Sequence, residues 1–230
     1  LPADVIVTQA GADTPDAQFP NNVFATTKDR LILGAMRHEV RRREAQRQDI
    51  QKLFTGLFAK RIEPLPSDCV AELTGPLIVD RGRNIGFCGL TERCDRRGAE
   101  AMEKAFGLDL TFVFALDPAE YHTNVVMSVL ASRALVIHPP SFLDPEVPRA
   151  IAELYGGKVI VLKDSEKAAF AGNCIALSDE DVWMSALAAA ALTPQHRADL
   201  AAWGFALKSE PLAEIEKAGG SLRCCIAEIY

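Results

Sequence analysis

The segment GGSLRCCIAEIY, residues 219–230, carries the local pattern on which the fold of this chain rests. A turn of small residues leads into an apolar run of high strand propensity, and Cys224 and Cys225 stand where the turn passes into the expected strand. Glycine lets the backbone approach closely what a side chain would block. A thiol at the mouth of such a strand is a candidate nucleophile, which needs a base and a substrate cradle from elsewhere in the chain.

Four earlier segments share this form, a small or polar opening followed by an apolar run; they are residues 19–26, 71–79, 121–128 and 170–177. Together with residues 221–228 they can be placed in one register, on Asn22, Thr74, Asn124, Asn173 and Cys224. The steps between these positions are 52, 50, 49 and 51 residues. Spacing this even indicates an internal repeat with a period near fifty.

The intervals between the opening segments also repeat. Each contains an apolar run typical of a strand, then a helical pattern, and the last three end in a further strand. The first runs are residues 31–33, 85–90, 134–138 and 182–185; the helical patterns are 39–59, 97–106, 145–155 and 194–203; the final strands are 110–114, 158–162 and 205–208. Gly107, Gly156 and Gly204 follow helices, as C-terminal glycines do, and Thr193-Pro194 is a capped helix start. Each unit therefore reads ββαβ.

Units of this size cannot bury their own faces, so they must share a core. Five of them close most naturally into a ring, an α/β-propeller with the opening segments around a central channel. We expect one domain over residues 1–230. Only 21 residues precede Asn22, so we expect the first unit to be incomplete and the N-terminus to be truncated.

Composition limits the classes of function. The chain has 230 residues, a net charge of −6 and 49% hydrophobic residues, which is typical of a globular protein and gives no electrostatic help to nucleic-acid binding. The basic cluster at residues 37–47 is interleaved with acids and reads as a solvated helix face. No apolar run approaches the ~18 residues of a membrane span. Six cysteines without CxxC spacing argue against zinc and favour a reducing, cytoplasmic compartment.

The common register predicts a constellation of reactive groups. Glu72 and His122 both stand two positions before the register residue, in neighbouring units, and Cys224 stands at the register position of the last unit. A thiol, an imidazole and a carboxylate at one mouth suit attack on a cationic carbon: the thiol attacks, the imidazole moves protons and the carboxylate holds the positive group.

Structural roles compete for several of these residues. A cysteine on a strand is more often a small core residue than a nucleophile, and we consider this alternative for Cys225 and Cys174. Three histidines outside the register, His38, His138 and His196, are interpreted as structural. The asparagines at the register positions could instead be structural turn residues. We leave this alternative open for Asn22 and Asn124 and favour it for Asn173.

Six motifs give the chain a family resemblance; they are TPDAQFPNNVFATT (14–27), AELTG (71–75), TERCD (91–95), YHTNVVMS (121–128), FAGN (170–173) and GGSLRCCIAEIY (219–230). With them the chain resembles the guanidine-modifying enzymes, the amidinotransferase or pentein superfamily, over essentially its whole length. The most similar branch is bacterial and is described as amidinotransferase or citrulline-utilisation hydrolase; arginine deiminase and dimethylarginine dimethylaminohydrolase are related. The resemblance implies a five-fold pseudosymmetric α/β-propeller.

By that resemblance Cys224 matches the nucleophile, His122 the general acid/base and Glu72 the carboxylate that binds the guanidinium. Cys225 is then a core strand residue. Glu92 matches an acidic loop residue, and Arg37, Arg41 or Arg42 falls where deiminases keep arginines for a substrate carboxylate. Asn22 and Asn124 stand where arginine deiminases have aspartates, which weakens the grip on a full guanidinium.

We therefore expect a C–N hydrolase that acts on a guanidino or ureido compound such as arginine or a methylarginine, through a covalent Cys-thiouronium, with no metal or organic cofactor. Amidino transfer and arginine dihydrolase action are alternatives, the latter because dihydrolases carry Asn at the position of Asn22. A non-catalytic binding protein of the same fold is the alternative from another class. The expected partner is a small guanidino substrate, with no nucleic acid and no membrane, and a homodimer is the one assembly considered.

Overall fold

The computed structural model describes residues 5–230 as a mixed α/β fold with four three-stranded sheets. In every sheet the first strand is antiparallel to the middle strand, which is parallel to the third. The first two sheets are β1 (Phe24–Thr26), β2 (Arg30–Leu33), β3 (Arg61–Pro64) and β4 (Leu77–Asp80), β5 (Ile85–Leu90), β6 (Leu110–Ala115). The next two are β7 (Met127–Leu130), β8 (Ala134–Ile137), β9 (Val159–Val161) and β10 (Ile175–Ala176), β11 (Asp181–Ser185), β12 (Ala206–Glu210).

Helices connect the middle and third strands, because a parallel pair needs a crossover. They are α1 (Glu39–Ala45) with α2 (Gln48–Gly56), α3 (Arg96–Phe106), α4 (Glu146–Glu153), and α6 (Ala186–Ala191) with α7 (Pro194–Ala202). The start of α3 is fixed by Asp95, whose side chain accepts a hydrogen bond from the Gly98 amide, and its end by Gly107 in the left-handed conformation. Thr193 caps α7 in the same way. The short helices α5 (Asp164–Ala168) and α8 (Ala213–Glu216) were not predicted from the sequence.

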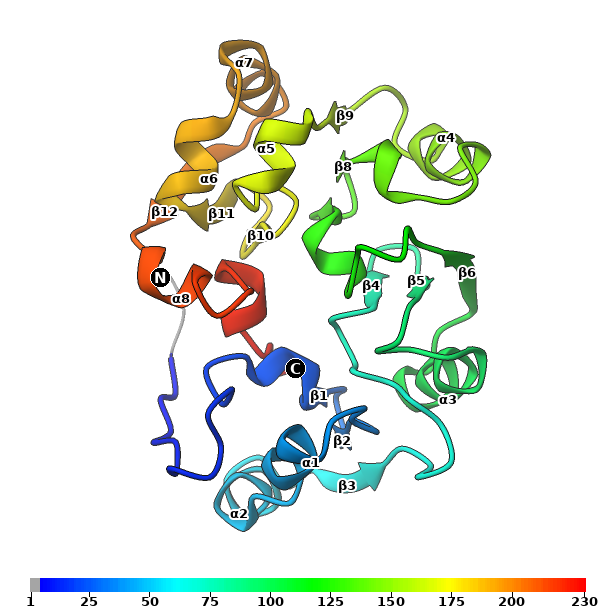
Figure 1. Cartoon of the computed structure of the whole chain (residues 1–230), viewed down its shortest axis with the longest axis vertical. Coiled ribbons are helices and arrows are strands. Elements are labelled where there is room, and N and C mark those ends of the chain that lie inside the picture. The colour runs from blue at the N-terminus through cyan, green and yellow to red at the C-terminus, as the bar shows by residue number, and fades with distance from the viewer. Residues whose placement is uncertain (1–4) are drawn as a thin grey trace.

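The four units lie in chain order around a common centre, with the helices outside and the opening segments inside (Figure 1). Three opening segments form short 3-10 turns, η1 (Pro20–Asn22), η2 (Thr123–Val125) and η4 (Leu222–Cys225); a fourth 3-10 turn, η3 (Pro139–Ser141), follows β8. The apolar residues form several clusters. One joins β4, β5 and β6 to β7 and β8, so the units bury their faces against one another, as expected.

The repeat of ββαβ units is confirmed, with two corrections. The first unit, β1 to β3, is complete. The fifth opening segment is the one without a sheet: within residues 5–230 it contributes η4 and no strand. Cys225 is therefore a half-buried residue of a 3-10 turn, whose thiol donates to the Ser221 carbonyl oxygen at 3.4 Å, and not a core strand residue.

Within residues 5–230, none of the helices combines the length and the apolar character that crossing a bilayer requires.

Candidate active site

The centre of the site is a buried pair between two neighbouring units. The His122 Nε2 atom lies 2.9 Å from the Glu72 Oε2 atom, and the two side chains are 2% and 0% exposed. The register had placed these residues at equivalent positions fifty apart, and the structure brings them into contact. Gly75 makes this contact feasible, because a Cβ atom there would lie 2.8 Å from the His122 ring and from the Asn22 Oδ1 atom.

Two further groups donate to the Glu72 carboxylate. The Arg93 guanidinium lies 3.3 and 3.4 Å from its two oxygens, and the Arg37 backbone amide donates to Oε1 at 3.3 Å. Burial alone would raise the pKa of Glu72, but the bond to His122 and the charge of Arg93 hold that pKa below its ordinary value. Glu72 is therefore an ionised carboxylate inside the protein.

The pair also fixes the tautomer of His122. An ionised carboxylate can only accept a hydrogen bond, so the Nε2 atom of His122 carries the hydrogen and donates it to Glu72. Burial lowers the pKa of His122, and the Glu72 contact offsets part of that effect. The ring is then neutral, and its Nδ1 atom, buried and without a partner among the described residues, keeps a free lone pair. This nitrogen can accept a proton and return it.

Cys224 is the third of the four residues of η4 and is 2% exposed. The Asn173 Nδ2 atom donates to its sulfur at 3.2 Å, and the sulfur lies 3.8 Å from the Asn124 Oδ1 atom. Burial raises the pKa of the Cys224 thiol, although the contacts with the Ser221 backbone and Asn173 and the charge of Arg223 reduce this rise. In the ligand-free protein the thiol is thus mainly protonated at neutral pH.

The Gly219-Gly220 turn ahead of Cys224 has two separate uses. Gly219 adopts the left-handed conformation at φ 87°, and a Cβ atom on Gly220 would lie 2.7 Å from the Phe19 ring. The Tyr121 hydroxyl donates to the Gly219 carbonyl oxygen, which joins the residue before His122 to the turn before Cys224. The turn therefore sets how closely the fifth opening segment packs on the first.

The register residues form a chain of hydrogen bonds from unit to unit. The Thr74 hydroxyl donates to the Asn21 carbonyl, Asn124 donates to the Thr74 carbonyl and Asn173 to the Asn124 carbonyl, at 3.0, 3.1 and 2.8 Å. The Cys224 amide then donates to the Asn173 Oδ1 atom at 3.4 Å. We call these bonds the register chain. Asn124 and Asn173 link units, whereas the buried Asn22 Oδ1 atom has no partner within the described chain.

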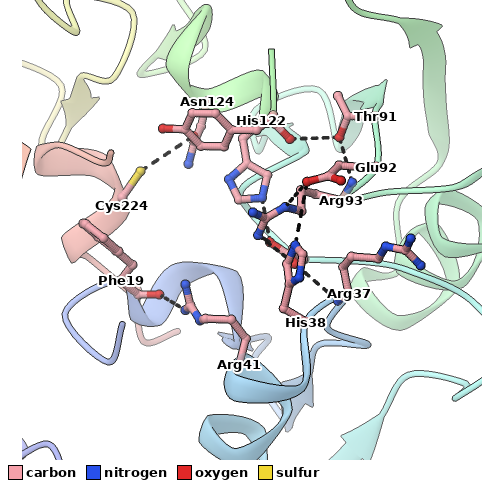
Figure 2. A network of polar contacts seen from close by, with 12 residues as sticks. Phe19, Arg37, His38, Arg41, Thr91, Glu92, Arg93, His122, Asn124 and Cys224 are labelled. Atoms are coloured by element: carbon pink, nitrogen blue, oxygen red, sulfur yellow. Dashed lines mark hydrogen bonds and ion pairs between the residues drawn. The ribbon is translucent and has the colours of Figure 1, made fainter. Parts of the chain in front are cut away.

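A pocket of about 310 Å³ lies between four of the units; its lining includes Phe19, Asn22, Arg93, Tyr121, His122 and Cys224. This volume is in the range of small-molecule sites. Figure 2 shows Cys224 and Asn124 on one side of His122, with Arg93 and Glu92 on the other. Within residues 5–230 no group of three His, Cys, Asp or Glu side chains is placed to hold a metal ion.

Other predicted residues lie at the edge of the site or outside it. Arg37 is exposed, and the structure brings its backbone amide, not its guanidinium, to Glu72 (Figure 2). Glu92 is also exposed, 3.0 Å from Arg93 and 3.7 Å from His38, and His38 lines the pocket. His138 and His196 bond Ser141 and Glu166 at 2.7 Å, as structural histidines do.

Three contacts were not predicted from the sequence. Arg93 was passed over beside Glu92, although any buried carboxylate calls for a cationic partner. Asn173 was interpreted as a turn residue, although its register position equals that of Cys224. Arg41 was placed on a solvated helix face and was one of three arginines offered for a substrate carboxylate; its contacts were not predicted, since it is buried, lines the pocket, and donates to Glu44 at 2.9 Å and to the Phe19 carbonyl oxygen at 2.8 Å.

Two solved structures share this fold. The N-terminal domain of ArgZ, a cyanobacterial arginine dihydrolase solved with its substrate, superposes with a TM-score of 0.82 at 22% identity, covering 94% of this chain and 76% of that one. A dimethylarginine dimethylaminohydrolase adduct with S-methyl-L-thiocitrulline gives 0.74 at 20% identity, covering 94% and 77%. The fold is therefore that of the arginine dihydrolases and dimethylarginine dimethylaminohydrolases.

Sequence comparison gives the family. This chain belongs to the family described as N,N dimethylarginine dimethylhydrolase, eukaryotic, which matches residues 3–230, so the resemblance to guanidine-modifying enzymes is confirmed. It is 27% identical to the N(G),N(G)-dimethylarginine dimethylaminohydrolase of Mycobacterium tuberculosis, covering 73% of this chain and 52% of that protein. It is 24% identical to the bifunctional arginine dihydrolase/ornithine cyclodeaminase ArgZ of Synechocystis sp., covering 91% and 28%. The chain thus spans about half the length of the first relative and less than a third of the second.

Proposed function

We propose that this chain hydrolyses a C–N bond in the guanidino group of arginine or a methylarginine, through a covalent intermediate on Cys224. The observation that carries the proposal is the buried Glu72–His122 pair, whose histidine lines the same pocket as Cys224. A cationic, planar guanidinium suits this pocket because Glu72 supplies a fixed negative charge and Asn22 an unpaired amide oxygen. The solved relatives and the family point to the same chemistry.

The reaction follows from the protonation states. The thiol and the imidazole are both neutral in the free site, and a bound guanidinium stabilises the thiolate beside it. The Cys224 proton then passes to the His122 Nδ1 atom as sulfur attacks the central carbon. His122 returns this proton to the departing nitrogen, the C–N bond breaks, and a thiouronium remains on Cys224. Water, deprotonated by His122, adds to the same carbon, the C–S bond breaks, and a ureido product leaves with the thiol restored.

The rim of the pocket supplies groups for the other end of the substrate. We assign the carboxylate of an arginine-like substrate to Arg93, because its side chain is partly exposed and lines the pocket. Glu92 and His38 stand next to it and suit an ammonium group. Asn22 and Asn124 complete the guanidinium cradle, and in this proposal the Arg37 guanidinium has no direct role.

A second candidate is arginine dihydrolase action, in which the ureido product is attacked again, so that two ammonias and carbon dioxide leave in all and ornithine remains. The neutral Asn22 favours it, since an unpaired amide suits a neutral ureido group better than a carboxylate would. ArgZ, one of the matched relatives, is named as a bifunctional arginine dihydrolase/ornithine cyclodeaminase. Citrulline as end product supports the first candidate, and ornithine the second.

We also propose an architecture for the whole chain. Residues 1–230 form one domain of a five-bladed α/β-propeller, in which the segment around Cys224 belongs to the fifth blade. We expect it in the cytoplasm, with a homodimer as the candidate assembly.

The decisive experiment incubates the protein with arginine, methylarginines and agmatine, and measures ammonia, released amine, citrulline and ornithine. Cys224→Ala is the matched control. Glycine as an added acceptor tests amidino transfer, which would give guanidinoacetate. No turnover of any substrate, together with binding of one, would establish the non-catalytic alternative; full activity of Cys224→Ala would contradict the mechanism.

A further inference from the structure

Asn173 is a fully buried side chain whose hydrogen bonds converge on the nucleophile. Its Nδ2 atom donates to the Cys224 sulfur at 3.2 Å and to the Asn124 carbonyl at 2.8 Å, while its Oδ1 atom accepts from the Cys224 amide at 3.4 Å. A carboxamide has two donor hydrogens and one acceptor oxygen, so every polar atom of Asn173 is used here. It contacts the reacting sulfur directly.

Apart from the Ser221 backbone, few other groups stabilise a negative charge on that sulfur. Cys224 is almost completely buried, and its own helical turn is a short 3-10 segment. The nearest cationic side chain along the chain, Arg223, is tied to Glu228 at 3.0 Å. His122 is neutral when the pocket is empty. A buried anion without a positive partner depends on hydrogen-bond donors, and such bonds strengthen when the acceptor becomes charged.

Asn124 acts in the opposite direction. Its Nδ2 atom is fixed on the Thr74 carbonyl at 3.1 Å, so its Oδ1 atom faces the sulfur, at 3.8 Å. A carbonyl oxygen accepts from a thiol and repels a thiolate. The two register asparagines therefore present a donor and an acceptor to one sulfur atom.

We propose that Asn173 is the thiolate-stabilising residue of this site: its amide N–H holds the ionised sulfur of Cys224 while its oxygen fixes the backbone of the same residue. This inference rests on the proposed function for the role of Cys224 as nucleophile, and it assigns to Asn173 a catalytic contact in addition to its place in the register chain.

The test measures the rate of Cys224 alkylation by iodoacetamide against pH, without substrate. Mass spectrometry of the peptide that contains Cys224 follows the reaction. All variants carry Cys225→Ala, although burial already raises the pKa of Cys225 to about 12 and keeps it unreactive. Loss of a hydrogen bond to a charged group is expected to move the midpoint of Asn173→Ala upward by about one to two pH units. The rate at pH 7 then falls about tenfold or more.

Ser128→Ala is the matched control. The Ser128 hydroxyl bonds the carbonyl oxygens of Gly172 and Cys174, on either side of Asn173, at 2.7 and 2.8 Å. Its loss loosens the same loop without touching the sulfur, so the melting temperature should fall while the alkylation midpoint stays in place. Asn173→Asp keeps the size and the acceptor but removes the donor and adds charge, and should move the midpoint at least as far as Asn173→Ala. If Asn173→Ala does not fold, Asn173→Asp provides the test in its place.

An unchanged midpoint in the Asn173 variants, or an equal shift in Ser128→Ala, overturns the proposal. The turnover assay is run in parallel on the parent protein. If that protein turns over no guanidino compound, the proposed function fails, whereas the alkylation profile still decides the role of Asn173.

Discussion

Replacement of Glu72 by glutamine tests the centre of the site, because it removes one buried charge and keeps the shape of the side chain. Glu72 is 0% exposed and accepts from the His122 ring at 2.9 Å, from the Arg93 guanidinium at 3.3 and 3.4 Å and from the Arg37 amide at 3.3 Å. Breaking a buried ion pair costs about 3–5 kcal/mol. In the variant Arg93 still pairs with Glu92 at 3.0 Å, and it is partly exposed to solvent. We therefore expect the free energy of unfolding to fall by about 2–3 kcal/mol.

The melting temperature should fall by about 5–10 °C, because each kcal/mol corresponds to ~2–4 °C in a chain of this length. The loss should depend on pH with a definite sign. The folded pKa of Glu72 is lowered, so its stabilisation is fully present above the unfolded value of about 4.3 and is lost as the pH falls through the lower folded value. The parent and Glu72→Gln curves should therefore converge in strong acid. kcat/KM should fall by about 10²–10⁴, since His122 loses the anion that orients it.

Thermal melts from pH 3 to 8 and turnover assays at pH 7 measure both effects. Glu92→Gln is the control, because it removes the same chemical group from an exposed position on the same guanidinium. Its melting temperature should stay within the scatter of the measurement. A loss in Glu72→Gln no larger than in Glu92→Gln, or a gap that stays constant into acid, would refute the assignment of Glu72 as a buried carboxylate.

The remaining predictions concern the groups around this pair. Gly75→Ala places a methyl group 2.8 Å from the His122 ring, so it should cost about 1–3 kcal/mol of stability and most of the activity; a variant as active as the parent would contradict the close packing. Cys224→Ala should abolish covalent labelling by a guanidino-type inactivator while Cys225→Ala keeps it, as intact-mass spectrometry can show; labelling of Cys225 would reverse the assignment. Arg93→Lys should raise KM for arginine about tenfold or more but hardly change it for agmatine, which lacks the carboxylate, because lysine does not reproduce a planar fork. Equal effects on both substrates would show that Arg93 acts through Glu72 alone.

Much of this arrangement could be predicted from the sequence because the repeat is regular. Glu72 and His122 were paired by their equal places before the register residue, and their contact follows from the equal geometry of neighbouring units. The strand and helix patterns were equally clear, since each unit buries the same faces.

The unpredicted part depends on geometry that is not periodic. Arg93 reaches Glu72 from the turn between β5 and α3, and nothing in a one-dimensional pattern shows where that turn points. Asn173 looks like any turn asparagine until Cys224 is seen against it. The charge pattern of α1 marks its face as solvated, yet Arg41 and Glu44 are buried together.

The register chain has a consequence for how this protein matures. Glu72, His122 and Cys224 come from the second, third and fifth opening segments, and the links between them span fifty to a hundred residues. No stretch of two adjacent units contains all three of these residues. A partly folded chain therefore lacks catalytic activity even if several sheets have formed. Turnover therefore counts only molecules in which these distant segments have met, and the rate at which activity appears during refolding times the last step of assembly.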